Sequence, residues 1–473
     1  MVKDRAVRAM GGSSIGGRRK SRKKRVPAAV FAAIFLAVAV ALLGGSARYD
    51  AGQLILLQPI AFLALGFGAV KLSSEGVGDF KTPLMLLGGL VLLMIVQLVS
   101  IPQGLWSAMP GRDVVSDIDA ALGVELWRPL SLVPSRTLNA LFGLAIPASA
   151  LLIFLALDPS RRRPIILTLL IAIALVSAAF AALQLLGPAD SWMYLYRFSN
   201  FGHAVGLFAN ANHAAVFASL AMIVIGYLLV SVGGEEIDKL QVILLVASFA
   251  FIFILALLSG SRLGLITSVI ALLTVFAAFC TRPAGSGPRI SRRLGAGFTI
   301  AFVLGIAAIA LLFFAADRIP ALAELLSDRP IEDIRLRVLG TLVEMAGGYF
   351  PVGSGFGTFE NVYYIFEPDS ELRPSYLNMA HNDWAQFVIE AGLPGIILLL
   401  GAFWWIMRIA MALGSNPMHR PALIALAGGV LVVAVASLFD YPLRAPLFQF
   451  ACVWLLACLW DFALDNSASE TRE

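Results

Sequence analysis

The chain has 473 residues, of which 59% are hydrophobic and 14% are charged, and its formal net charge is +5. Soluble domains are usually about half apolar and about one quarter charged, so this composition excludes an ordinary soluble protein. The apolar residues gather in blocks of roughly 20, which predicts transmembrane helices rather than the alternating strands of a membrane barrel. The basic residues lie in short intervals between these blocks, where membrane topology explains them better than nucleic-acid binding does.

Residues 1–26 form a basic tail that ends in Arg18-Arg-Lys-Ser-Arg-Lys-Lys-Arg25. A basic segment before a first span favours the cytoplasmic side and attracts anionic membrane lipids. The apolar run that follows is longer than the core of a cleaved signal peptide, so we expect a retained membrane anchor.

Twelve transmembrane helices are predicted, which makes this an all-α polytopic membrane protein. The first nine spans fill 27–316, the last three fill 392–462, and 463–473 form a C-terminal tail. Arg161-Arg-Arg163 and the arginines after the eighth span fall on the predicted cytoplasmic side, which places both termini in the cytoplasm. The predicted spans are 27–45, 52–72, 83–101, 137–157, 165–187, 212–232, 240–258, 263–281, 295–316, 392–413, 422–439 and 445–462.

The longest polar interval, 317–391, is predicted to be a periplasmic loop subdomain with amphipathic helices. Apolar residues recur at helical spacing within 330–348, which indicates a helix with one apolar face. A glycine-rich stretch, 350–359, follows it. We interpret this stretch as a tight turn rather than a nucleotide loop, because no strand of a βαβ unit precedes it. The apolar residues of the helix are Ile331, Ile334, Val338, Leu342 and Met345.

Two arginines of the predicted helix lie in different surroundings on a helical wheel. Arg337 falls on the polar side near Glu344, where a solvated salt bridge explains it. Arg335 falls at the edge of the apolar face, and an arginine there indicates a ligand such as a lipid phosphate or a diphosphate.

Near the end of this loop lies His381, one of four histidines in the chain. Imidazole titrates near neutral pH, so His381 suits a general base. The alternative is an interfacial histidine that caps a helix or bonds a carbonyl. Asn382 and Asp383 follow it at the predicted start of a helix that continues into the tenth span.

Two shorter outer intervals also carry polar residues. In Ser259-Gly-Ser-Arg262, the arginine either binds a phosphate or is an end-of-span arginine that reaches toward the headgroups. In Asn210-Ala-Asn212-His213, the asparagines either cap a helix or contact a sugar. No His/Cys cluster and no metalloprotease-type motif is present, so a metal-independent mechanism is expected.

Four stretches of the chain form one pattern. They are His381-Asn382 with Gly392-x-x-Gly395 nine residues later, Ser259-Gly-Ser-Arg262-Leu-Gly264, Pro351-Val-Gly-Ser-Gly-Phe-Gly-Thr-Phe359 and Gly206-Leu-Phe-Ala-Asn210-Ala-Asn212. With this pattern the chain resembles, over roughly 130–445, the O-antigen ligase and O-antigen polymerase superfamily of bacterial envelope proteins. In the Ser-Gly-Ser-Arg turn, Leu263 stands where that family often has glycine.

The resemblance implies a metal-independent, GT-C-like membrane glycosyltransferase of the bacterial inner membrane, without a cofactor. Its donor would be a glycan on undecaprenyl diphosphate, presented among membrane lipids at the periplasmic face. Its acceptor would be lipid A-core in a ligase, or another lipid-linked repeat in a polymerase. His381 would be the catalytic residue, and Arg262 with Arg335 or Arg337 would bind the diphosphate. The supporting or substrate-orienting residues would be Asn382, Asn210, Asn212 and Ser261.

A transporter is the alternative from a different class. Transporters carry ionisable residues at mid-membrane depth and broken helices in repeated halves. Here the predicted spans are nearly free of central charges and the polar residues gather in outer loops, which favours an enzyme.

Overall fold

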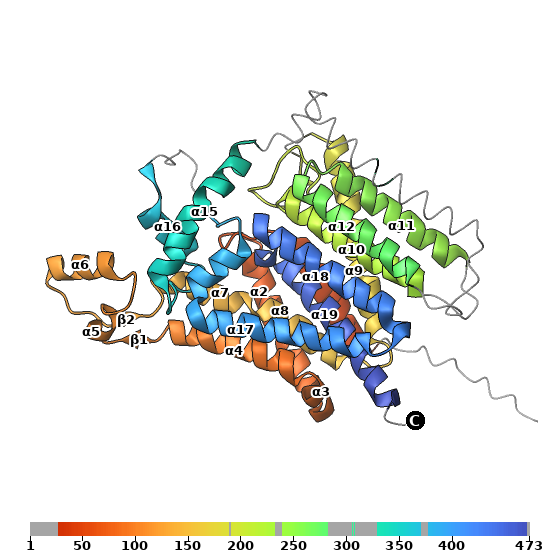
Figure 1. Cartoon of the computed structure of the whole chain (residues 1–473), viewed down its shortest axis with the longest axis horizontal. Coiled ribbons are helices and arrows are strands. Elements are labelled where there is room, and N and C mark those ends of the chain that lie inside the picture. The colour runs from red at the N-terminus through yellow and green to blue at the C-terminus, as the bar shows by residue number, and fades with distance from the viewer. Residues whose placement is uncertain are drawn as a thin grey trace, which may run out of the picture.

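The computed structural model describes residues 27–188, 191–231, 239–281, 305, 307, 329–369 and 377–470. In these ranges the protein is a helical bundle with one short antiparallel ribbon, β1 (Ser100–Ile101) with β2 (Arg128–Pro129), at one end (Figure 1). The ninth predicted span, 295–316, lies outside the described residues apart from Gly305 and Ala307.

Nine helical segments in the described ranges are long and apolar enough to cross a membrane. Two shorter apolar helices, α1 (Ala28–Leu43) and α4 (Lys81–Gln97), coincide with the first and third predicted spans. Every predicted span apart from the ninth overlaps one of these helices, so the all-α, multi-span prediction is confirmed. The other spanning helices are α2 (Leu54–Lys71), α7 (Pro134–Gly143) with α8 (Ala145–Ala156), α9 (Arg162–Leu186), α10 (Ala211–Ser231), α11 (Lys239–Leu257), α12 (Arg262–Cys280), α17 (Asp383–Gly414), η2 (Pro417–His419) with α18 (Arg420–Phe439), and α19 (Pro446–Glu470).

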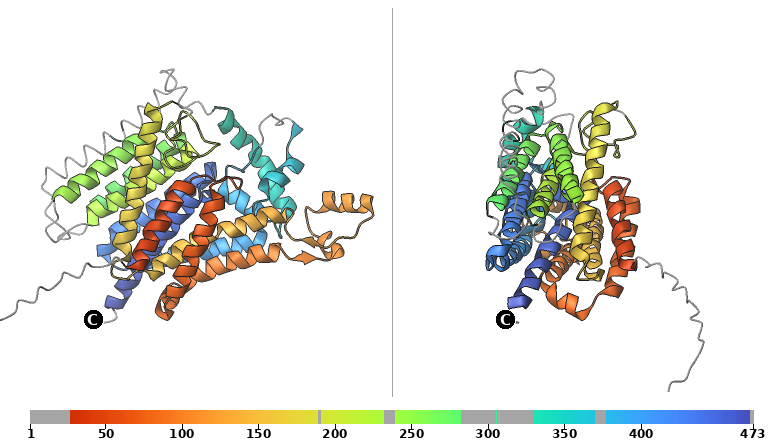
Figure 2. Two further views of the ribbon diagram at one scale, coloured as in Figure 1. Left: turned by 180° about the vertical axis from the view of Figure 1, so that it is seen from behind. Right: turned by 90° about the vertical axis from the view of Figure 1, so that its right-hand side faces the viewer.

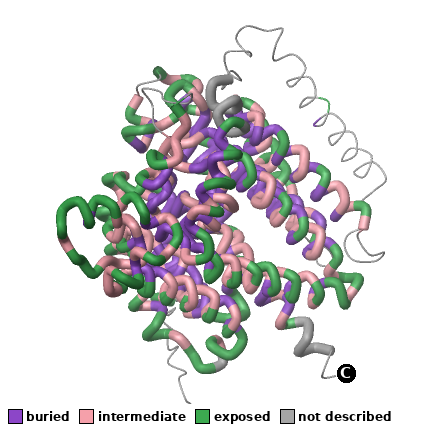
Figure 3. Tube along the Cα trace, turned by 60° about the vertical axis from the view of Figure 1, so that its left-hand side comes forward, coloured by how far each residue is buried: buried purple, intermediate pink, exposed green. Residues whose placement is uncertain are grey.

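The bundle is centred on α10, which packs against α9, α11, α12 and α18. Glycines let these helices approach closely, as is usual in membrane bundles. A Cβ on Gly226 of α10 would lie 2.2 Å from Val275 of α12, and one on Gly428 of α18 would lie 2.1 Å from Thr274. Buried residues run along the middle of the bundle (Figure 3), and Figure 2 shows the same helices from behind and from the side.

Large apolar side chains cover the outside of the bundle. On α2, Ile55, Leu63 and Val70 are each at least 75% exposed, a surface that suits a lipid environment. Cys280, the last residue of α12, is exposed as well.

Most of the described helices outside the spans lie at one end of the bundle, which we call the site end. They include α5 (Gln103–Trp106), α6 (Asp113–Leu122), α15 (Arg329–Tyr349) and α16 (Phe359–Phe366), which lie together at the left of Figure 1. Helix α15 coincides with the amphipathic helix predicted over 330–348. Its Val338, Leu342 and Met345 are buried as the wheel predicted, and they pack with α16 and the start of α17. The two remaining short elements are α3 (Ser74–Asp79) and η3 (Pro442–Arg444).

A buried arginine joins these outer parts. The Arg112 guanidinium donates to the carbonyl oxygens of Leu130 (2.7 Å) and Gly353 (2.9 Å), so it ties the first outer loop to the glycine-rich turn. Burial lowers the pKa of Arg112 to about 10, which leaves the side chain charged at neutral pH.

Candidate active site

Four helix ends meet at the site end around one carboxylate. Asp440 is the C-cap residue of α18, and the N-termini of α10, α12 and α17 all contribute side chains near it. Because helix N-termini carry partial positive charge, this arrangement favours an ionised acid at Asp440.

Asp440 is completely buried and is surrounded by donors. Asn212 Nδ2 of α10 donates to its Oδ2 at 2.6 Å. His381 Nδ1 lies 3.5 Å from its Oδ1, and His213 Nε2 lies 3.6 Å from the same oxygen. Burial pushes the pKa of Asp440 up, but the interactions with His213 and His381 outweigh it and hold that pKa well below its usual range. Asp440 is therefore an ionised carboxylate that faces two imidazoles.

The Ser-Gly-Ser-Arg turn is joined to this carboxylate through one asparagine. The Ser261 hydroxyl donates to Asn212 Oδ1 at 2.6 Å and accepts from the backbone N–H of Gly264 at 2.8 Å, which caps α12. A Cβ on Gly264 would lie 2.4 Å from the side chain of Ala215, so glycine is needed where α12 approaches α10. Both the oxygen and the nitrogen of the Asn212 amide are thus hydrogen-bonded inside the protein, which favours a supporting role over contact with a sugar.

The predicted catalytic histidine is held in an unusual backbone conformation. His381 has φ of +49°, the only positive φ of a non-glycine residue in the described ranges. Its side chain is 14% exposed, and its ring meets the Tyr441 ring edge-on at 4.9 Å. Asn382, not His381, caps α17, because its Oδ1 accepts from the Ala385 N–H at 2.9 Å. The capping alternative for His381 is therefore wrong, and Asn382 has a structural role.

The two glycine motifs are one structural unit. Gly392 breaks α17 with φ of +58°, and at this break the Leu393 N–H donates to the Pro351 carbonyl at 2.8 Å. The glycine-rich turn docks there, with the Ser354 N–H bonded to the Ile389 carbonyl at 2.9 Å. A Cβ on Gly392 would lie 2.3 Å from the Pro351 oxygen. The turn fixes the start of α17 and so fixes His381.

The backbone N–H groups of the glycine-rich turn are used inside the protein. Gly355 donates to the Glu390 carbonyl at 3.0 Å, and Phe356 donates to Gln97 Oε1 at 3.0 Å. This agrees with a tight turn and leaves these groups unable to cradle a phosphate.

A second charged group lies beside Asp440. Arg444 Nη1 lies 2.8 Å from Glu390 Oε2, and its Nε lies 3.5 Å from Asp383 Oδ1. Glu390 also accepts from Gln386 Nε2 at 3.0 Å, and Asp383 accepts from the Leu443 N–H at 3.1 Å. This network joins α17 to η3 and holds the short connection that carries Asp440.

The proposed phosphate ligands are placed less closely. Arg262 is the first residue of α12, adjacent to Ser261, and is partly buried at the site end. Arg337 is exposed on α15. Arg335 lies in the first half of α15, where the structure describes the helix but not its side chain. Asn210 precedes α10, and its Oδ1 accepts from the Asn212 N–H at 2.8 Å, the contact expected of a helix cap, which is one of the two roles the sequence allows.

Asp440, Arg444 and His213 were missed as site residues by the sequence reasoning. A signal was present, because residues 440–444 form a very short interval between two apolar blocks and yet hold two opposite charges. Ionisable residues that close to apolar blocks are expensive, and they are usually paired or functional.

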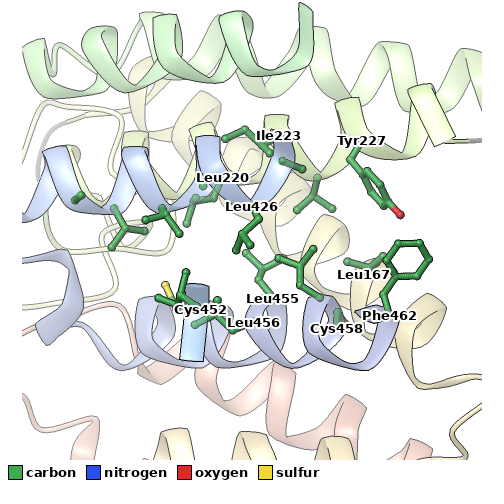
Figure 4. A pocket seen from close by; sticks show the side chains of 18 of the residues that line it. Leu167, Leu220, Ile223, Tyr227, Leu426, Cys452, Leu455, Leu456, Cys458 and Phe462 are labelled. Atoms are coloured by element: carbon green, nitrogen blue, oxygen red, sulfur yellow. The ribbon is translucent and has the colours of Figure 1, made fainter. Parts of the chain in front are cut away.

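An apolar cavity of about 660 Å³ opens beside the site. Side chains of α10, α18 and α19 point into it, as Leu220, Leu426 and Leu455 do in Figure 4. Trp384 and Leu443, neighbours of Asp383 and Arg444, line it near the site, and the cavity continues toward the opposite ends of the helices. Its size and lining suit a lipid chain.

No group of three or more His, Cys, Asp or Glu side chains with the geometry of a metal site occurs among residues 27–470 where the structure describes them. The known metal-binding motifs are also missing from the sequence, so nothing in this chain identifies a metal ligand set.

Residues 247–400 match the family model described as O-antigen ligase, from within α11 to within α17. The match includes Ser261, Arg262, the whole of α15 and His381, whereas Asn212 and Asp440 lie outside it. No curated protein matches the chain.

Proposed function

Because the chain belongs to the O-antigen ligase and polymerase superfamily through its domain at 247–400, we propose that it is a glycosyltransferase of the bacterial inner membrane. It moves a glycan from undecaprenyl diphosphate to lipid A-core at the periplasmic face. The observation that carries this proposal is the pairing of His381 with the buried carboxylate of Asp440. A base held by an ionised acid suits the activation of a hydroxyl.

The transfer follows from this geometry. Asp440 Oδ1 lies 3.5 Å from His381 Nδ1 and favours the tautomer with the proton on that nitrogen, which leaves the Nε2 lone pair to accept the proton of the acceptor hydroxyl. The acceptor oxygen then bonds to the anomeric carbon, and the bond from that carbon to the diphosphate oxygen breaks. Its electron pair leaves with the undecaprenyl diphosphate. Asp440 stabilises the imidazolium that forms on His381.

The leaving group needs cations more than it needs a base. Arg262, with Arg335 or Arg337, binds the diphosphate and stabilises the negative charge that develops on it. Arg262 is the better placed of the described side chains, because it follows Ser261, which is bonded to the Asn212–Asp440 pair. The role of the helix α15 arginines is the part of the proposal that rests on the family pattern.

The apolar cavity takes part of the polyprenyl chain of the donor. It begins at Trp384 and Leu443, within a few residues of Asp383 and Arg444, so a chain that enters it keeps its diphosphate near the site. Nearly all the lining side chains are apolar, so the cavity offers such a chain surroundings similar to the lipid acyl chains it leaves.

The test is genetic and chemical. A strain that lacks the coding sequence is complemented with wild type, His381→Ala or His203→Ala, all at matched expression, and its glycan pools are profiled. We expect His381→Ala to match the deletion, with long glycan on undecaprenyl diphosphate and bare lipid A-core, whereas His203→Ala complements. Accumulation of single repeat units instead identifies a polymerase. Unchanged glycan pools in the deletion strain overturn the proposal and favour a transporter.

A further inference from the structure

Tyr441 follows Asp440 in the short connection between α18 and η3, and the mechanism above gives it no role. Its ring meets the His381 ring edge-on, with 4.9 Å between the ring centres and 70° between the ring planes. It meets the His213 ring edge-on as well, at 5.0 Å and 86°. One aromatic ring therefore contacts both imidazoles that lie near the buried carboxylate. Edge-on pairs at such distances are favourable beyond the area that they bury.

The backbone on either side of His381 is fixed by hydrogen bonds. The Ala380 N–H donates to Gln386 Oε1 at 3.0 Å, and the Ala385 N–H donates to Asn382 Oδ1 at 2.9 Å. Between them His381 has its positive φ of +49°. These contacts fix where the side chain of His381 begins, but they do not fix the rotation of its ring, which is broadly distributed for histidine. The direction of the imidazole therefore depends on what the ring itself touches.

The carboxylate of Asp440 does not fix that direction alone. In the part of the chain that the structure describes, His381 Nδ1 has no hydrogen-bond partner, and its 3.5 Å separation from Asp440 Oδ1 is a charge contact. The attraction between charges depends on their distance and not on the angle of the ring, so the imidazole can tilt while the attraction changes little. An edge-on aromatic contact does restrict the ring plane, because its energy depends on the angle between the two rings.

Tyr441 is itself held in place. Its N–H donates to Asp440 Oδ1 at 2.9 Å, and its carbonyl oxygen accepts from the Arg444 N–H at 3.1 Å, within η3. Its ring contact with His213 joins it to the first turn of α10, the helix at the centre of the bundle. The Tyr441 ring therefore links the catalytic imidazole to two fixed elements of the protein.

We propose that Tyr441 is a positioning residue: its aromatic ring holds the imidazole of His381 in the orientation in which Nδ1 faces Asp440 and Nε2 is left for the acceptor hydroxyl. The inference rests on the proposed function for its catalytic meaning, whereas the restraint on the imidazole stands on the geometry. The contacts that carry the proposal are made by the aromatic ring. Phenylalanine should therefore replace Tyr441, and an aliphatic residue should not.

Solid-state NMR in lipid bilayers measures this restraint without any substrate. The full chain is labelled with ¹³C,¹⁵N-histidine, and single His→Gln variants assign the signals. The readout is the order parameter of the ring C–H bonds, which reports how far each ring moves. In the wild type we expect the His381 ring to be as ordered as the ring of His213, which is 1% exposed. Tyr441→Leu lowers the order parameter of His381, and Tyr441→Phe keeps it.

Three results overturn the proposal. They are a wild-type His381 ring that is clearly more mobile than the His213 ring, an unchanged order parameter in Tyr441→Leu, and equal losses in Tyr441→Leu and Tyr441→Phe. The matched control is Phe201→Leu, which removes an edge-on pair with Tyr194 (5.1 Å) in the loop before α10 and leaves His381 ordered. If Tyr441→Leu does not fold, the wild-type comparison decides.

Activity gives the second measurement. The kcat and the KM for undecaprenyl-diphosphate-linked glycan are measured in proteoliposomes with lipid A-core. Tyr441→Leu lowers kcat by about tenfold, the upper end of what one aromatic pair contributes, and leaves the KM for the donor unchanged. Tyr441→Phe and Phe201→Leu keep the wild-type kcat. A change in KM without a change in kcat, or a loss in Tyr441→Phe as large as in Tyr441→Leu, contradicts positioning by the ring. Absence of transfer by the wild type refutes the proposed function instead, and the NMR measurement still decides whether Tyr441 restrains His381.

Discussion

Replacing Asp440 by asparagine removes the charge that stabilises His381 when it accepts a proton, while it keeps the shape of the side chain. At an effective dielectric constant of about 20, two opposite charges separated by the 3.5 Å between His381 Nδ1 and Asp440 Oδ1 attract by roughly 4–5 kcal/mol. His381 is 14% exposed, so water screens part of this attraction. About 3–4 kcal/mol remains, which corresponds to a loss of about 10²–10³-fold in the rate of transfer.

The assay is single-turnover transfer from a radiolabelled undecaprenyl-diphosphate-linked glycan to lipid A-core, with the purified full chain in proteoliposomes. Because Asp440 does not touch the donor in the proposed mechanism, the donor concentration for half-maximal rate changes little. The matched control is Asp50→Asn, which breaks the surface pair of Asp50 with Arg48 at the same end of the protein. A surface pair contributes about 0–1 kcal/mol, so the control keeps most of its activity. An Asp440→Asn protein that folds and transfers within about threefold of wild type refutes the charge argument.

Three further predictions test the support of the site, the cavity and the pH dependence. Gly392→Ala places a Cβ within 2.3 Å of the Pro351 oxygen at a residue with positive φ, so we expect its thermal unfolding midpoint to fall. The control Gly88→Ala, in open space on α4, keeps the wild-type midpoint. Equal midpoints for the two variants contradict the docking of the glycine-rich turn. Gly429→Phe places a ring in the apolar cavity, so we expect it to raise the KM for a long-chain donor but not for a short-chain analogue. Gly88→Phe, outside the cavity, is the control. An equal effect on both donors argues against a polyprenyl site. The pKa of Asp440 is lowered in the folded protein, so its ionised form contributes stability above about pH 4 that is lost as the pH falls through the folded value. The difference in unfolding free energy between wild type and Asp440→Asn should therefore shrink as the pH falls below about 4, and a difference that grows over that acid range contradicts this sign.

The arrangement of spans was predictable because a membrane helix needs little more than a long apolar run. Helix α15 was predictable for a related reason, since Val338, Leu342 and Met345 recur at helical spacing and are buried as expected. The sequence shows Gly392 as part of a glycine motif but does not show that α17 breaks at this residue. Its cause is a contact with Pro351, 41 residues away in the sequence, and spacing along the chain does not show that contact.

The site itself was predicted in part. Ser261, Asn212 and His381 were named separately, and the structure joins them through hydrogen bonds and one carboxylate. The sequence could not show this joining, because Asp440 comes from the end of α18, far from the other three in the chain. Arg335 and Arg337 remain predictions on the basis of the wheel and the family pattern.

The position of Asp440 also explains why the polar residues are scattered among separate intervals of the sequence. In a membrane bundle, a buried carboxylate is costly unless several donors meet it, and the polar residues at helix starts are one source of such donors. Asn212 and His213 lie in the first turn of α10, Ser261 caps α12, and His381 precedes α17. Each helix start brings one or two polar side chains, and their convergence on the end of α18, together with the Tyr441 N–H at 2.9 Å from Asp440 Oδ1, surrounds the acid with donors. A single continuous motif could not do this, because its residues would all lie at the start of one helix.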